Sequence, residues 1–110
     1  MARVFDDYLD DLIEIAHNIV MTNDIFLSNV RSNIINAFAL IESSPTTRET
    51  AWTVEQAGIK LLKAYSTSPF YSDRRAVEAA TKFFVDKVEL LREEMHKCNL
   101  SNRGYAFGTH

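Results

Sequence analysis

Two Glu-x-x-His pairs have the spacing in this sequence that most suggests metal chemistry. They are Glu14–His17 and Glu93–His96. In helical bundles that hold two iron ions, two such pairs face inward and meet, with a carboxylate from each remaining helix. Here both pairs fall on the polar sides of their predicted helices, near opposite ends of the predicted bundle. The two histidines therefore cannot share one ion within a monomer, and we predict no metal site and no cofactor.

Arginine and histidine also occur together in the last fifth of the chain, a combination that could act on a phosphate. Small helical ribonucleases of the HEPN type use an Arg-x(4–6)-His pair carried on a helix. Arg103 and His110 have this spacing but lie in a segment without helical periodicity, whereas Arg92 and His96 lie on a predicted helix one residue too close. A ribonuclease or other phosphate-handling enzyme that uses these residues is therefore the alternative function.

The composition is that of one small helical domain. The chain has 110 residues, of which 46% are hydrophobic and 25% charged. This length is close to the commonest domain size and is sufficient for a single core. Only three glycines and two prolines occur, which argues against a β-rich fold with many tight turns. The net charge of −3 gives no general reason to expect nucleic-acid binding.

The sequence also bears on the expected compartment. The single cysteine, Cys98, excludes an internal disulfide and a cysteine-based zinc site. The first eleven residues contain four aspartates where a signal peptide would have an apolar run, and no segment approaches 18 consecutive apolar residues. We therefore expect a cytoplasmic protein that does not enter a membrane.

Breaks in the hydrophobic periodicity divide the chain into four helices. Thr22-Asn23-Asp24, Ser43-Ser44-Pro45-Thr46 and Ser66-Thr67-Ser68-Pro69 supply capping residues and helix stops. The predicted helices span about 3–21, 24–42, 46–65 and 73–97, with Thr46 and Glu49 as a capping box for the third. Residues 1–98 form the domain, and residues 99–110 are expected to be an irregular tail.

Each predicted helix has an apolar stripe that can face a common core. Short connections between helices of similar length favour antiparallel neighbours, so we predict an all-α, up-down-up-down four-helix bundle. The stripe of the third helix is narrow and includes Ala51 and Gly58, which would let a neighbouring helix approach closely.

The second predicted helix has an unusual outer face. Residues 25–47 contain only two charged side chains, Arg31 and Glu42. Interface centres are depleted in charge, and we therefore predict that this face contacts protein. It combines small polar and aliphatic side chains, and its predicted interface residues are Ile25, Ser28, Asn29, Ser32, Asn33, Asn36 and Leu40, with Ala39 beside them.

Two further groups of residues are candidates for a second contact. Trp52 and Ile59 lie a heptad apart, off the main stripe of the third helix. Either that helix is broad on its buried side, or Trp52 is an exposed anchor of the kind enriched among interface hot spots. Phe70 and Tyr71 follow Pro69 at a predicted chain reversal, where they either contact a partner or cap the core.

These observations favour a non-enzymatic module that binds protein and associates with itself as a dimer. Small inhibitors, immunity proteins, phage-encoded modulators and assembly chaperones have this build, although a likeness at the level of fold does not identify a function. No catalytic residue is assigned under this hypothesis, and a nucleic-acid or membrane partner is not expected.

Overall fold

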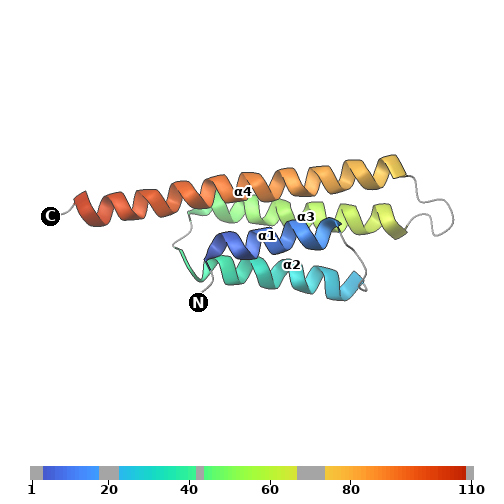
Figure 1. The fold of residues 1–110 in the computed structure, drawn as a ribbon, viewed down its shortest axis with the longest axis horizontal. Helices are drawn as coiled ribbons and strands as arrows, with labels where there is room; N and C mark the ends of the chain where they lie inside the picture. The colour runs from blue at the N-terminus through green and yellow to red at the C-terminus, as the bar shows by residue number, and fades with distance from the viewer. Residues whose placement is uncertain (1–3, 18–22, 42–43, 67–73, 109–110) are drawn as a thin grey trace.

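The computed structural model describes residues 4–17, 23–41, 44–66 and 74–108, and these ranges contain four helices and no strand. The helices are α1 (Phe5–His17), α2 (Asn23–Phe38), α3 (Pro45–Ser66) and α4 (Arg74–Gly108). Successive helices run in opposite directions (Figure 1), and α1 packs on α2 and α4 while α3 packs on α2 and α4. The predicted antiparallel four-helix bundle is confirmed.

The core is formed by one stripe from each helix, as the periodicity predicts. Two phenylalanines, Phe26 of α2 and Phe84 of α4, meet near its centre with ring centroids 6.2 Å apart. The buried apolar residues are Phe5, Leu9, Leu12, Ala16, Phe26, Val30, Ile34, Ala37, Ala51, Val54, Ala57, Leu61, Leu62, Phe84, Val88, Leu91 and Met95. Two stripe positions are more exposed, namely Val4, which precedes α1, and Tyr65 near the end of α3.

The helix boundaries follow local hydrogen bonding. α3 begins one residue earlier than predicted because Ser44 is its N-cap: the Thr47 amide donates to Ser44 Oγ over 3.2 Å, and Pro45 occupies the first helical position. Ser44 therefore caps α3, and the expected capping role of Thr46 is wrong. α2 ends at Phe38, where the Leu40 amide turns back to the Ala37 carbonyl over 3.1 Å.

The prediction of an irregular tail from residue 99 is also wrong, because α4 continues to Gly108. In Figure 1 this end of α4 projects beyond the other three helices. The prediction of a tail rests on the absence of an apolar period in this segment. A helix that has already formed, however, gains one backbone hydrogen bond for each added residue without needing a new nucleus. Residues 99–108 contain no proline that would stop it.

Gly58 lies where α3 passes between two aromatic rings. A Cβ built at this position would lie 3.5 Å from Phe26 Cε1 and 3.5 Å from Phe84 Cε2. These are ordinary van der Waals distances, so the close approach of the helices does not require glycine here. Glycine inside a helix costs about 0.5–1 kcal/mol relative to alanine.

We therefore expect Gly58→Ala to raise the free energy of unfolding by about 0.5–1 kcal/mol. Urea denaturation followed by circular dichroism would measure the change. A lower free energy of unfolding in the variant would mean that the two rings cannot accommodate the added methyl group.

Candidate interaction surface

The outer surface of α2 carries apolar and small polar side chains with little charge. Ile25 is 52% exposed and Leu40, in the turn after the helix, is 48% exposed. Ser28, Ser32, Asn36 and Ala39 are also exposed. Asn29 and Asn33 are half-buried, and Asn33 Nδ2 donates to the Asn29 carbonyl over 2.8 Å. The predicted residues therefore lie mostly outside, but Asn33 is turned back onto its own helix.

Ile35 belongs to this surface and is missing from the predicted set. At 66% exposed it exceeds every other large apolar side chain whose exposure the structure describes. The signal for it was present in the sequence, because Ile35 follows Ser28 by one heptad and Arg31 by one turn. When Val30 and Ile34 are assigned to the core, the side of α2 that carries Ile35 must face outward.

The structure resolves the two interpretations of Trp52. Its side chain is 59% exposed, so α3 is not broad on its buried side at this position. Ile59 is half-buried on the same flank of α3. Phe70 and Tyr71 lie outside the described residues.

An ion pair joins the flank of α2 that carries Ile35 to the flank of α3 that carries Trp52. Arg31 Nε lies 3.9 Å from Glu55 Oε1, and the two side chains are 58% and 31% exposed. This contact indicates which levels of α2 and α3 lie beside each other. It also shows that residues predicted as two separate patches belong to neighbouring helices on one side of the bundle.

The helical repeat places further residues above and below this ion pair. Ser28 and Ile35 lie three residues before and four after Arg31, while Trp52 and Ile59 lie three before and four after Glu55. Because α2 and α3 are antiparallel, Ile35 and Trp52 extend from the ion pair toward the same end of the bundle, by about 6 and 4.5 Å along their helices, and Ser28 and Ile59 extend toward the other end. We call these six residues the α2–α3 face: Ser28, Arg31, Ile35, Trp52, Glu55 and Ile59.

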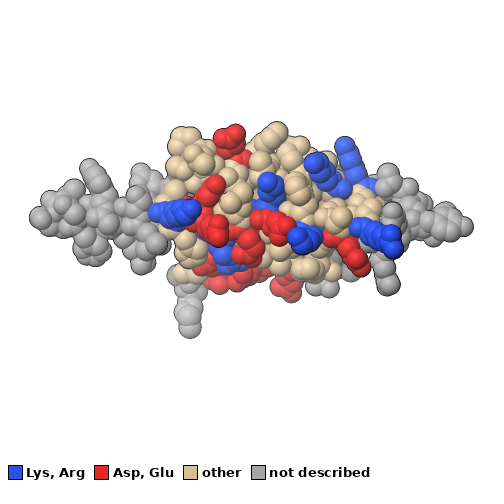
Figure 2. Space-filling model, turned by 90° about the horizontal axis from the view of Figure 1, so that it is seen from above, with Lys and Arg blue, Asp and Glu red and all other residues tan. Residues whose placement is uncertain are grey.

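The surface around α4 has a different character. Figure 2 looks onto α4 and shows acidic and basic side chains interspersed along its length. Phe83, 41% exposed, has the ammonium groups of Lys60 and Lys87 within 5.0 and 5.3 Å of its ring centroid. The exposed ring of Phe83 therefore has charged groups beside it, as apolar residues on an ordinary solvated surface do.

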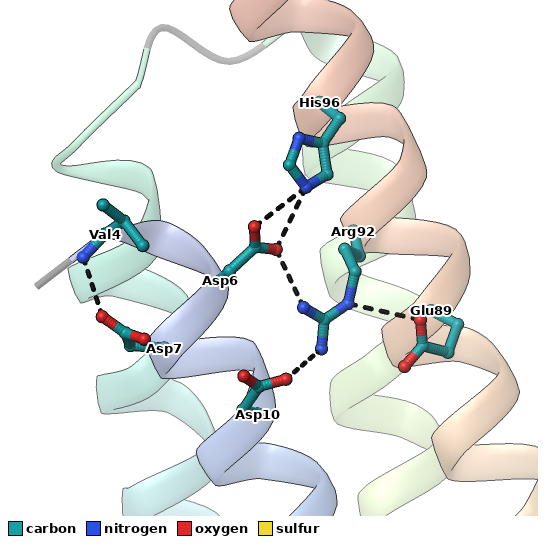
Figure 3. Close-up of polar contacts among 7 residues, drawn as sticks. All are labelled: Val4, Asp6, Asp7, Asp10, Glu89, Arg92 and His96. Atoms are coloured by element: carbon teal, nitrogen blue, oxygen red, sulfur yellow. Dashed lines mark hydrogen bonds and ion pairs between the residues drawn. The ribbon is translucent and has the colours of Figure 1, made fainter.

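The arginine and histidine of the alternative hypothesis lie between α1 and α4 (Figure 3). Arg92 donates to Asp6 Oδ1 over 2.9 Å and to Asp10 Oδ1 over 2.5 Å, and its Nε lies 3.2 Å from Glu89 Oε2. His96 Nε2 lies 3.0 Å from Asp6 Oδ2. The sequence did not predict this network, because it joins residues more than 80 positions apart.

The electrostatics of this network disfavour a phosphate. Burial lowers the pKa of Arg92, but the hydrogen bond to Asp10 and the charges of Glu89, Asp10 and Asp6 outweigh that effect and raise it. Three carboxylates thus surround one guanidinium, and both of its terminal nitrogens donate to aspartates of α1. An incoming phosphate would have to displace these carboxylates while meeting their repulsion. Of the residues predicted for phosphate chemistry, Arg92 and His96 instead form an interhelical ion-pair network.

The remaining candidate residues do not assemble into a second site. His17 ends α1, whereas His96 contacts Asp6 at the other end of that helix, so the two Glu-x-x-His pairs lie far apart. Across the described ranges, no three His, Cys, Asp or Glu side chains are placed to hold a metal ion. Arg103 lies on α4 rather than in an irregular tail, and His110 is outside the described residues. No helix in these ranges is long and apolar enough to cross a membrane.

Comparison with protein-family models, with curated proteins and with solved structures finds no match to this chain. The functional argument therefore depends on the surfaces described above.

We expect Arg92→Met to lower the free energy of unfolding by about 1–3 kcal/mol, because three carboxylates would lose their common counter-charge at the α1–α4 contact. Lys82→Met is the matched control, since its pair with Asp86 is exposed at both ends, and such pairs contribute about 0–1 kcal/mol. Urea denaturation at low salt would compare the two variants. Equal effects would mean that the network adds nothing beyond an exposed ion pair.

Cys98 offers a test of the contact between α3 and α4. Its Sγ lies 3.3 Å from Thr47 Oγ1, and this hydrogen bond, with those from Ser44, lowers the pKa of the thiol against the opposing effect of burial. The rate of alkylation by iodoacetamide should therefore rise with pH around a midpoint below that of an ordinary thiol. Thr47→Val should move the midpoint upward, whereas Thr53→Val, which removes a hydroxyl bonded only to its own helix, should leave it in place. A midpoint that Thr47→Val does not move would contradict this assignment.

Proposed function

We propose that this chain is a non-enzymatic module that binds protein, and that the α2–α3 face is its contact surface. The observation that carries the proposal is the exposure of Ile35 and Trp52 side by side, 66% and 59%. Single exposed apolar residues are ordinary. Two large ones on neighbouring helices, close to an arginine and with almost no other charge on α2, have the composition of an interface centre.

Self-association and a cytoplasmic setting are parts of the same proposal. A protein that exposes such a face at high concentration meets its own copies first, so a homodimer is the simplest assembly. A single unpaired cysteine, here Cys98, suits a reducing compartment, where free thiols persist. The enzymatic alternative has less support, because Arg92 is held by acidic side chains.

We expect Ile35→Glu and Trp52→Glu to abolish protein binding, since each would place a charge at the centre of the contact. The immobilised full chain and its variants would be used to capture proteins from an extract of the source cells, with quantitative mass spectrometry of what is retained. Each variant should reduce specific retention at least tenfold. Both side chains are largely exposed, so the free energy of unfolding should change by no more than about 0.5 kcal/mol.

Leu90→Glu is the matched control, because Leu90 is a large apolar residue 40% exposed on α4 and away from the α2–α3 face. It should retain the same proteins as the unchanged chain. Equal loss in all three variants would indicate non-specific apolar adsorption and remove the support for this face. RNA cleavage by the full chain that disappears in His96→Ala would favour the enzymatic alternative instead.

A further inference from the structure

The α2–α3 face has a pattern that is complementary to itself. It consists of two antiparallel rows, Ser28–Arg31–Ile35 on α2 and Trp52–Glu55–Ile59 on α3, joined at the ion pair between Arg31 and Glu55. Each side chain of one row has a chemically suitable neighbour in the other row. Ile35 corresponds to the indole of Trp52, Arg31 to Glu55, and the small Ser28 to the larger Ile59. The α2 row of one molecule could therefore contact the α3 row of a second molecule and form the same residue pairs.

We propose that this face binds a second copy of the chain, with a two-fold axis parallel to the bundle, so that α2 of each copy lies across α3 of the other. The inference rests on the proposed function and names its partner. A half-turn about such an axis puts Arg31 opposite Glu55 of the partner subunit and Ile35 opposite Trp52 of the partner subunit. The contact is isologous, since each pair occurs twice.

Charge selects this axis over the alternative. A two-fold axis that crosses the helices at right angles would place the α2 row of one molecule on the α2 row of the other, and the α3 row on the α3 row. Arg31 would then face Arg31 of the partner subunit, and Glu55 would face Glu55 of the partner subunit, so that like charges meet at the centre of the contact. With the axis parallel to the bundle, the four charges alternate in sign and add to zero.

The area available around the α2–α3 face indicates that both helices take part along most of their length and that the dimer is weak. The outer strip of α2 alone, with 16 residues, is roughly 24 Å long and 10–12 Å wide, or about 250 Å². Adding the neighbouring strip of α3 roughly doubles this projected area to about 500 Å². Stable interfaces bury about 800 Å² of accessible surface on each partner. A contact of both helices therefore approaches the lower end of the stable range, whereas α2 alone falls well short.

The test uses charge reversal in separate molecules of the full chain, followed by sedimentation equilibrium and native mass spectrometry. Arg31→Glu and Glu55→Arg should each raise the dissociation constant of the homodimer at least tenfold, because four like charges would then meet. An equimolar mixture of the two variants should form a heterodimer with an affinity within about threefold of the unchanged protein. Repair of the ion pair inside one molecule cannot explain that recovery, since each variant still lacks it.

The double variant R31E/E55R tests the direction of the axis. Its homodimer should have the same affinity as that of the unchanged protein. It should not form mixed dimers with the unchanged protein, because Arg31 would then face an arginine introduced at residue 55. If mixed dimers form in preference to either homodimer, like positions face each other and the proposed pairing is wrong. Far-UV circular dichroism of each variant would verify that the helices remain folded.

Two outcomes would overturn the inference, and they differ in what they mean for the proposed function. If the unchanged chain is monomeric at 500 µM, or if mixing the single variants gives no heterodimer, the second copy is not the partner, and the self-association part of the proposed function fails with it. If proteins from the cell extract are still retained through Ile35 and Trp52, the face remains a protein-binding surface for another partner. If retention is also insensitive to those residues, the proposed function fails as well.

Discussion

Burial of one stripe from each helix is the constraint on which the arrangement of every surface depends. Once Phe26, Val30 and Ile34 are inside, the opposite flank of α2 must be outside, whatever residues it carries. The same constraint turns Trp52 outward when Ala51 and Val54 are buried. The α2–α3 face is therefore a consequence of core packing acting on a sequence that has apolar residues on both sides of two helices.

The charged groups at the α1–α4 contact and at the α2–α3 contact differ in how closely they are paired. Between α1 and α4, Arg92 is 20% exposed and neutralised by carboxylates from both helices, so its guanidinium is largely used within the molecule. Between α2 and α3, Arg31 is 58% exposed and approaches Glu55 only to 3.9 Å. A pair that is both long and exposed contributes little to folding, and its charges remain accessible to another surface.

The sequence predicted the features that depend on local periodicity. The four helices, their order and nearly the whole core follow from the apolar repeat, because that repeat is what burial requires. It did not predict the length of α4, since residues 99–108 are helical without an apolar stripe. Nor did it pair Arg31 with Glu55 or Arg92 with Asp6, since those distances depend on the level at which two helices pass each other.

Ile35 and Trp52 are large apolar residues that the folded chain itself does not bury. Neither side chain fills the core, and both retain more than half of their exposure, so neither contributes much apolar burial to the folded chain. Serine or lysine at these positions would satisfy the bundle equally well. Any substantial burial of these two side chains must therefore come from a surface outside the chain. A rigid pair of helices suits that role, because it holds both side chains in place before contact and reduces the entropy lost on binding.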